Sequence, residues 1–216
     1  MAAEAEKTFG QVAFLPKTVA AYTEVSRLLL LQSNADFVIA RDLLRIIGTA
    51  IDKAALYGTG LNGQPIGLAS LAGVGAFSGA TASVSTFTTA FVGLGDALGN
   101  RGGVAANRST AGLLRTRPES TYSSRTLWDG ELTDGTVINY PARSSTAIPS
   151  GNAIVGSWEY LVIAVWGGIE LMVNPYGDRV TGTANFQKGV VGYRVMATVD
   201  TGVVYPSAFT VGTGVT

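Results

Sequence analysis

The stretch that decides the fold is ALYGTGLNGQPIGL, residues 55–68. It joins the end of an apolar, helix-like segment to a loop that is rich in glycine. Gly58 to Gly63 match the letters of the dinucleotide-binding pattern G-x-G-x-x-G, but that pattern needs a strand before it and a helix after it. Here a helical pattern precedes it, Pro65 follows it, and no G-K-[ST] ending is present. The stretch therefore predicts a helix end and a turn, and not a nucleotide site.

A long helix is predicted directly before this loop, over residues 36–57. Its apolar residues recur at steps of three and four: Phe37, Ala40, Leu44, Ile47, Ile51 and Ala54. The opposite face is also apolar and carries Ile39, Leu43, Ile46 and Ala50. Asn34 or Asp36 is suited to cap the first turn, and Gly58 to end the last. Such a helix spans roughly 32 Å, and we expect it to be contacted on most sides.

The residues before this helix alternate between apolar and polar in the manner of strands. We expect two short strands within residues 9–26, starting at Phe9 and separated by Pro16, which interrupts strand pairing. Four consecutive leucines, Leu28 to Leu31, follow and end at the polar pair Ser33-Asn34. We expect this apolar turn or short helix to fill part of a core.

Two further helices are predicted after the loop. Residues 68–85 are rich in Ala, Gly and Ser and offer little to build a core, so we expect them to be mobile. Ser85 or Thr86 is suited to cap the next helix, which closes at Gly99 and a turn at residues 101–103. Its apolar stripe consists of Phe87, Phe91, Leu94 and Leu98. Asn107 is suited to cap the following helix, which stops before Pro118.

From Leu127 onward the pattern is that of strands. Asp129-Gly130 and Asp134-Gly135 are typical turn pairs. Strands are predicted over residues 137–140, 153–158, 160–166, 169–173, 190–200 and 203–211. Helices and strands are thus mixed without the regular alternation of βαβ units, which predicts an α+β fold.

The composition excludes several classes of function. The 216 residues include no cysteine and no histidine, which argues against disulfides, thiolate and imidazole metal sites, and catalytic triads. Fifteen basic and fifteen acidic residues balance, and no Lys or Arg run indicates sequence-specific nucleic-acid binding. Charged residues make up only 14%, against about 25% in an average protein, so we expect much of the surface to be covered by something.

Two targeting possibilities are also disfavoured. The most apolar stretch, residues 160–173, is interrupted by glycines and Glu170, so a membrane span is not expected. The start of the chain lacks the apolar region of a secretory signal, so we expect synthesis in the cytoplasm.

No residue is predicted to be catalytic, cofactor-binding or metal-binding. Asp129, Glu131 and Asp134 form a small acidic cluster, but their spacing departs from a calcium loop, and turn chemistry explains them. Arg41, Arg45, Asp42 and Asp52 lie on one helix, either as a solvated strip or as an intersubunit ion pair. The aromatic residues are expected to divide between core and interface. They include Trp128, Trp158, Trp166, Tyr140, Tyr160, Tyr176 and Tyr193.

The order of these motifs resembles the major capsid proteins of tailed phages of the Hong Kong 97 type. The resemblance rests first on the block from Phe14 to Leu29, which is similar to the strand that leaves the family's extended loop. Next come the long helix, the Gly-x-Gly of residues 58–60, and Gln64-Pro65-Ile66-Gly67-Leu68. The long helix is similar to the family's spine helix.

Later segments extend the resemblance over nearly the whole chain. Residues 107–114, 145–149, 154–158 and 195–209 are each similar to family elements, although Asn174-Pro175 stands where the family often has Asp-Pro. Relative to a complete member, the N-terminal arm and most of the extended loop would be absent before Phe9. No crosslinking residues are therefore carried over.

The resemblance implies a Hong Kong 97-type fold with a spine helix at about residues 36–57. It implies a peripheral lobe at residues 1–67, an axial lobe at 68–157, and return strands shared between the two lobes at 158–216. The function implied is that of a structural subunit, not an enzyme, in an icosahedral phage or prophage capsid that self-assembles around packaged DNA. The implied location is the virion.

The partners implied are copies of the same chain in pentamers and hexamers, with portal and scaffolding proteins as possible additions and no cofactor. Two alternatives stay open. An encapsulin-like compartment shell shares the fold but encloses enzymes. A carboxylate-dependent enzyme would need two acids that converge in a pocket.

Overall fold

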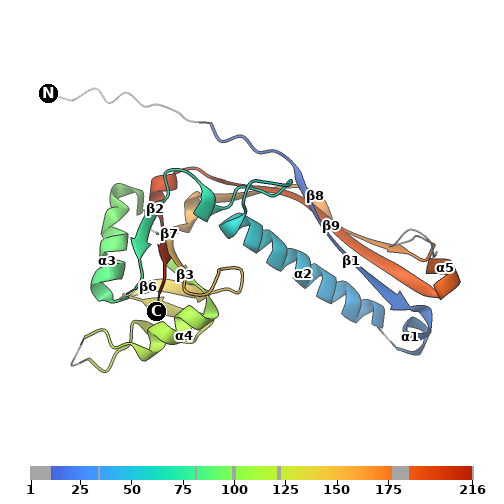
Figure 1. Cartoon of the computed structure of the whole chain (residues 1–216), viewed down its shortest axis with the longest axis horizontal. Coiled ribbons are helices and arrows are strands. Elements are labelled where there is room, and N and C mark those ends of the chain that lie inside the picture. The colour runs from blue at the N-terminus through green and yellow to red at the C-terminus, as the bar shows by residue number, and fades with distance from the viewer. Residues whose placement is uncertain are drawn as a thin grey trace.

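A computed structural model describes residues 11–33, 35–80, 82–98, 101–120, 123–176 and 185–215. Three of the predicted positions, Phe9, Asn34 and Gly99, lie outside these ranges. Figure 1 shows two parts along the long axis of the molecule: an elongated part that carries α2, β1, β8 and β9, and a rounder part that carries α3, α4 and the C-terminus. We call them the ribbon lobe and the sheet lobe.

The ribbon lobe is a helix on a thin sheet. Among the described residues, its sheet has three strands in the order β1-β9-β8, all antiparallel. The strands are β1 (Lys17–Ser26), β8 (Leu161–Asn174) and β9 (Val190–Val203), and the helices are α1 (Arg27–Gln32), α2 (Ala35–Tyr57) and α5 (Asn185–Lys188). The long helix is thus confirmed. The two strands predicted around Pro16 are in fact one strand, which begins after that proline.

The inward face of α2 packs on β9 and β1. Leu43 and Ile47 are buried there against Tyr193, Val195 and Val199 of β9. The predicted stripe was therefore only partly right, because it contained Ile47 but placed Leu43 on the opposite face.

Other apolar residues of α2 remain at the surface. Phe37 is 65% exposed, Leu44 42% and Ile46 46%. The expectation that α2 is contacted on most sides is therefore wrong for the single chain.

The sheet lobe holds seven strands among the described residues, in the order β2-β10-β7-β3-β6-β5-β4. Its strands are β2 (Gly75–Ser78), β3 (Gly102–Ala106), β4 (Trp128–Gly130), β5 (Asp134–Val137), β6 (Tyr140–Ser144), β7 (Ala153–Ser157) and β10 (Phe209–Thr213). Its helices are α3 (Val84–Gly93) and α4 (Arg108–Thr116), and short 3-10 turns lie at Leu68–Ser70, Gly95–Leu98, Trp158–Tyr160 and Pro206–Ala208. The β3–β6 and β2–β10 pairs are parallel and the others antiparallel.

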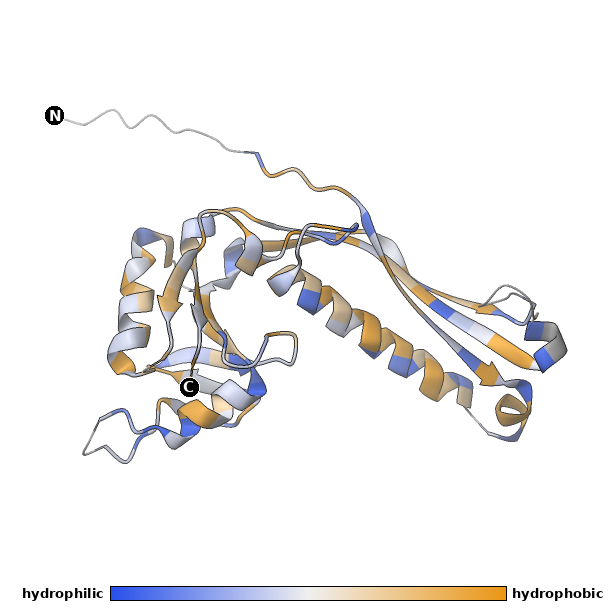
Figure 2. Cartoon of the chain, in the orientation of Figure 1, coloured by the Kyte–Doolittle hydropathy of each residue, from blue (hydrophilic) through white to orange (hydrophobic). Residues whose placement is uncertain are grey.

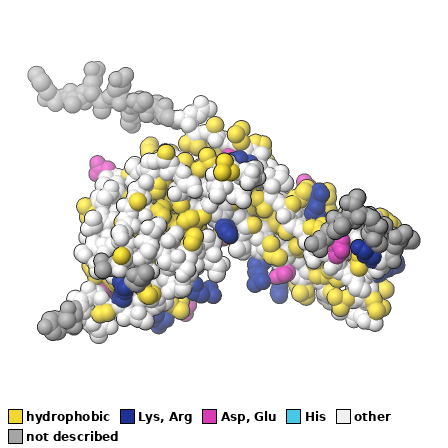
Figure 3. Space-filling model, in the orientation of Figure 1, with side chains coloured by type: hydrophobic (Ala, Val, Ile, Leu, Met, Phe, Trp, Pro, Cys, Tyr) yellow, Lys and Arg dark blue, Asp and Glu magenta, His cyan; other side chains and the backbone are white. Residues whose placement is uncertain are grey.

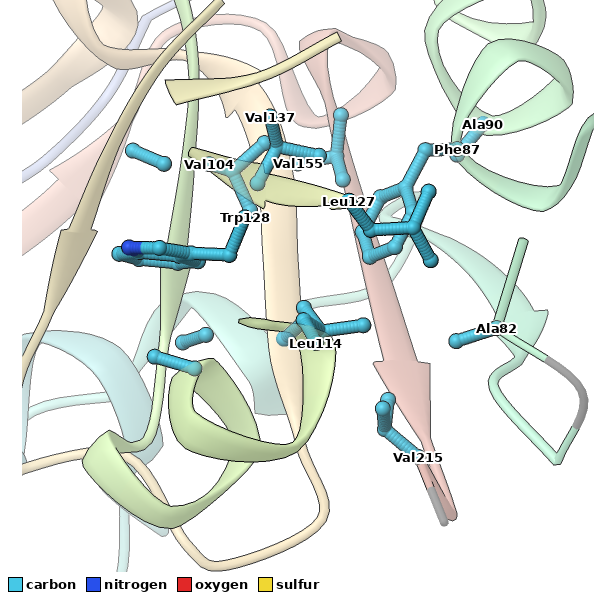
Figure 4. Close-up of a cluster of buried hydrophobic side chains, with 14 of the residues drawn as sticks. Ala82, Phe87, Ala90, Val104, Leu114, Leu127, Trp128, Val137, Val155 and Val215 are labelled. Atoms are coloured by element: carbon cyan, nitrogen blue, oxygen red, sulfur yellow. The ribbon is translucent and has the colours of Figure 1, made fainter. Parts of the chain in front are cut away.

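A closed apolar core fills one face of this sheet. Figure 4 shows Phe87 of α3, Leu114 of α4 and Trp128 of β4 converging on side chains from the strands, and each of the three is fully buried. The caps follow the sequence closely. The Asn107 side chain accepts the Ser109 N–H at 2.9 Å, as predicted, while Ser83 caps α3 two or three residues earlier than expected.

Several local predictions in the sheet lobe were wrong. Residues 68–85 were expected to be mobile, yet they supply β2 and the buried Leu68. Residues 101–103 were expected to turn, but Gly102 and Gly103 open β3. Residues 137–140 were expected to be a strand, but Ile138 and Asn139 form the turn between β5 and β6 with positive φ of 50° and 65°.

The last strands were also divided differently from the prediction. The segments 160–166 and 169–173 are one strand, β8, with an irregularity between Trp166 and Glu170. The segment 203–211 is split, because β9 ends at Val203 and β10 starts at Phe209.

The stretch at residues 55–68 joins the two lobes as a tight hairpin. The Gly67 N–H donates to the Gly58 carbonyl at 2.9 Å, and the Gly60 N–H donates to the Pro65 carbonyl at 3.1 Å. A Cβ on Gly67 would lie 2.2 Å from the Gly58 nitrogen, so this close approach requires glycine. Leu56 and Leu68, on either side of the hairpin, pack with Phe209 into the core between the lobes.

Candidate assembly surface

Short-range hydrogen bonds hold α1, and three of its four leucines are exposed. The Leu28 N–H donates to the Ser26 side chain at 3.3 Å, and the Ser33 N–H donates to the Leu29 carbonyl at 3.1 Å. Leu28 is 63% exposed, Leu29 49% and Leu31 75%. The leucine turn was predicted to fill part of a core, and this holds only for Leu30, which is partly buried and packs against the cluster of Leu43 and Ile47; no residue of α1 is fully buried. In Figure 3 hydrophobic side chains gather at this far end of the ribbon lobe.

The strand β8 is a long apolar edge. Among the described residues it pairs with β9 alone, so the backbone groups along its other side have no strand partner. Val165, Leu171 and Val173 lie opposite β9 residues on the face that α2 covers, yet they are 56%, 40% and 54% exposed. They are uncovered because α2 lies over β9 and β1 and not over β8. A long apolar edge strand is a ready template for another chain.

One flank of α2 continues this surface. Ala50 and Lys53 of α2 line a hollow with Thr18 and Val19 of β1, so the flank of α2 that carries Ala50 and Lys53 lies over β1. Phe37 and Leu44, seven residues and almost two turns apart, lie on the other flank, toward β8. Figure 2 shows the resulting hydrophobic colour along α2 and at α1.

We call this set the ribbon surface. It comprises Leu28, Leu29, Leu31, Phe37, Leu44, Val165, Leu171 and Val173.

The ribbon lobe also carries charged side chains, six of them on α2. On α2, Arg45 pairs with Asp42 at 3.1 Å, with both side chains more than half exposed, as a solvated strip would be; the alternative of an intersubunit ion pair stays a prediction. Partial burial raises the pKa of Asp52 above its ordinary value. Near the junction, Asp200 accepts the Leu15 N–H at 2.8 Å and lies 3.6 Å from the Lys17 ammonium. This carboxylate fastens the chain entering β1 to β9.

The structure gathers no reactive groups from the residues weighed as sites. Asp129 pairs with Arg125, and Asp134 with Arg143, each at 3.5 Å on the surface. Within the described ranges no three His, Cys, Asp or Glu side chains come together as a metal site. No described helix is both long and apolar enough to span a bilayer.

The aromatic residues were predicted to divide between core and interface; the core part is confirmed, and the interface part stays a prediction. Trp128 and Tyr193 are buried, whereas Trp166 is 38% and Tyr176 73% exposed. Sequence reasoning missed the outward direction of α1 and the edge position of β8. The first had a signal: four leucines in a row must point around a helix, so a single core cannot take all of them.

The comparison with protein families shows which family the chain belongs to. The model of the phage capsid family matches residues 1–214. The chain belongs to this family. The resemblance read from the sequence is thereby confirmed.

One curated relative and two solved structures show the extent of the likeness. The chain is 25% identical over 180 residues to the major capsid protein of Halomonas phage phiHAP-1, covering 80% of this chain but only 29% of that relative. Gordonia phage Cozz matches with a TM-score of 0.70 at 16% identity, covering 99% of this chain and 78% of the other. A virus-like particle from Pyrococcus furiosus matches with a TM-score of 0.63 at 13% identity, covering 91% and 75%. The fold is the Hong Kong 97-type α+β fold.

Proposed function

We propose that this chain is a structural subunit of an icosahedral phage or prophage capsid, which self-assembles around packaged DNA. The observation that carries the proposal is the ribbon surface, where leucines, valines and a phenylalanine are 40% to 75% exposed in the free chain. Burying apolar area contributes about 25 cal/mol per Å², so covering this surface with other copies favours association. Family membership and the name of the Halomonas phage relative support a shell as the product.

The two lobes take different places in this proposal. Residues 1–67 form a peripheral lobe with α2 as its spine, and residues 68–157 form an axial lobe that meets its neighbours around five- and six-fold axes. Residues 158–216 return between them, since β8 and β9 belong to the ribbon lobe and β10 to the sheet lobe. The proposed partners are copies of the same chain in pentamers and hexamers, together with portal and scaffolding proteins. The chain would be made in the bacterial cytoplasm and end in the virion.

An encapsulin-like compartment is the second candidate. It shares the fold, which a virus-like particle from Pyrococcus furiosus also has, but it has less support because the family and the curated relative are named as capsid proteins. The contents of purified particles separate the two candidates: packaged DNA supports the capsid, and an enclosed protein cargo supports the compartment. A carboxylate-dependent enzyme finds less support, because Asp129 and Asp134 pair with arginines at the surface.

Sedimentation velocity of the purified chain tests the assembly proposal. We expect species far heavier than 22.3 kDa that shrink when Leu31, 75% exposed on α1, is changed to lysine. Val92→Lys is the matched control, because Val92 is 73% exposed on α3 of the sheet lobe. A monomeric wild-type chain would contradict self-assembly. Equal loss in both variants would contradict the placement of the main contact on the ribbon lobe.

A further inference from the structure

A second recognition site lies on the sheet lobe, away from the ribbon surface. It is an open hollow of about 740 Å³ where α2 ends against the starts of β3 and β6, and it is lined by Leu56, Arg101, Gly103, Pro141, Arg143 and Trp158 among others. Its volume is within the usual range for binding pockets. We call it the β3–β6 hollow.

The hollow occupies the side of the sheet that α3 and α4 leave open. Side chains alternate between faces along a strand. Ala142 is fully buried in the core under the helices, so Pro141 and Arg143, its neighbours along β6, point to the other face. Gly103 contributes depth, because a Cβ there would lie 3.0 Å from the Pro141 carbonyl oxygen and 3.1 Å from the Trp158 Nε1 atom.

The polar groups that line the hollow are mainly donors. Arg101 is exposed, and no carboxylate among the described residues pairs with it. The Trp158 Nε1–H likewise has no acceptor within the described part of the chain, and Arg143 shares one contact with Asp134 at 3.5 Å. Leu56 and Pro141 make the remaining walls apolar. Such a lining fits a carboxylate on a short aliphatic stem.

A nucleic-acid backbone fits the hollow less well than a single carboxylate. Asp134 lies opposite Arg143, and Asp129 lies opposite Thr136, which in turn lies opposite Pro141, so both acids share the open face of the sheet. These negative charges beside the hollow would repel the several charges of a phosphate row more strongly than one carboxylate.

A matching carboxylate is present elsewhere on the same sheet lobe. Glu131 is exposed in the turn between β4 and β5, and no cation among the described residues pairs with it. Its backbone is fixed, because the buried Trp128 donates its Nε1–H to the Glu131 carbonyl at 2.7 Å. The side chain is therefore presented from a rigid position, at low entropic cost for binding.

Glu131 cannot reach the Arg101 end of the hollow within one chain. Glu131 adjoins β5 at the end where Asp134 pairs with Arg143, while Arg101 precedes β3 at the opposite end of the strands. The strand order β3-β6-β5-β4 also places Glu131 more than two strand spacings to the side of Arg101. The two residues are therefore roughly 20 Å apart. A group and its receptor at opposite corners of one surface produce a head-to-tail contact, which closes into a ring when the rotation allows.

We propose that Glu131 of one copy inserts into the β3–β6 hollow of the next copy and binds Arg101 and the Trp158 Nε1–H. This inference rests on the proposed function, because it needs copies of the chain to meet. It specifies a contact between sheet lobes that is independent of the ribbon surface.

Disulfide trapping tests the contact directly, since the natural chain has no cysteine. We expect an Arg101→Cys/Glu131→Cys double variant to form a ladder of crosslinked oligomers on a non-reducing gel after mild oxidation, because the two positions are too distant to bridge within one chain. Arg115→Cys/Glu131→Cys is the matched control, with an exposed arginine on α4. A ladder no stronger than the control would overturn the contact. Large wild-type assemblies without a ladder would overturn the contact but not the proposed shell. A ladder from a chain that forms no shell would support the contact and overturn the proposed shell.

A charge exchange provides a second test by sedimentation. Arg101→Glu and Glu131→Arg should each weaken association between sheet lobes about tenfold, and the two changes combined in one chain should restore most of it. A double variant as weak as either single variant would contradict the pairing. Binding of a labelled single-stranded oligonucleotide that is lost in Arg101→Glu would assign the hollow to phosphate and overturn the proposal.

Discussion

The two lobes bury their apolar residues in different ways. In the sheet lobe, helices α3 and α4 close over the sheet, and Phe87, Leu114 and Trp128 are fully buried. In the ribbon lobe one helix lies on a three-stranded sheet, so Leu43 and Ile47 are buried while Phe37 and Leu44 stay exposed. The core of the sheet lobe is therefore closed within one chain, whereas the ribbon lobe has an apolar surface that no described residue covers.

The largest expected effect comes from removing a large side chain from the closed core. Phe87→Ala should lower the free energy of unfolding by about 3–5 kcal/mol, because Phe87 is fully buried and makes an edge contact with Phe77 at 5.9 Å between ring centroids. Val92→Ala on the same helix should cost less than about 0.5 kcal/mol, because Val92 is 73% exposed. Urea titration measures both. Similar losses in the two variants would mean that the sheet lobe is not closed.

The same comparison within the ribbon lobe should give a smaller difference. Ile47→Ala should cost about 2–3 kcal/mol, near the lower end for such changes, because a single-layer core can relax toward solvent. Its neighbour Ile46 is 46% exposed, and Ile46→Ala should cost less than about 1 kcal/mol in the free chain. Urea titration at a concentration where the chain is dispersed isolates these values. A loss above that of Phe87→Ala would reverse the ranking of the two lobes.

A polar contact at the edge of the ribbon lobe should matter less again. Asp200→Ala removes the acceptor of the Leu15 N–H and the partner of Lys17, at an expected cost of about 1–2 kcal/mol. Hydrogen exchange at the Leu15 amide should also become faster. Asp200→Asn is the control, since its amide oxygen can still accept that N–H. Unchanged exchange in Asp200→Ala would show that the packing of residues 11–16, and not this hydrogen bond, holds the segment.

The contrast between lobes also explains what could be predicted from the sequence. The period of α2, the hairpin at residues 58–67 and the Asn107 cap depend on local chemistry, so all three could be found without a structure. The outward leucines of α1 and the edge position of β8 could not, because an apolar pattern shows that a residue needs cover but not which chain supplies it. Likewise, the turn at Ile138-Asn139 carries no glycine, and positive φ is rare for a β-branched residue. The sequence of residues 137–140 therefore predicted a strand where the structure has this turn.

The smallest expected effect concerns Asp52 on α2, whose pKa is raised. Burial near the C-terminal end of α2 raises the pKa of Asp52 above its ordinary 3.8, so the folded chain holds this proton more tightly than the unfolded chain does. The resulting stabilisation is fully present below the unfolded value and is lost as the pH rises through the folded value. At neutral pH the ionised carboxylate therefore carries a small cost.

Asp52→Asn should accordingly raise stability at pH 7 by less than about 0.5 kcal/mol and leave stability at pH 3 unchanged. Asp42→Asn, which instead loses the exposed pair with Arg45, should bring no gain at pH 7. Thermal unfolding at the two pH values measures the difference. A gain for Asp52→Asn would mean that the end of α2 beside the sheet lobe is already packed in the free chain, so that the uncovered part of the ribbon lobe lies toward α1. Equal behaviour of the two variants would instead extend the uncovered surface along the whole helix.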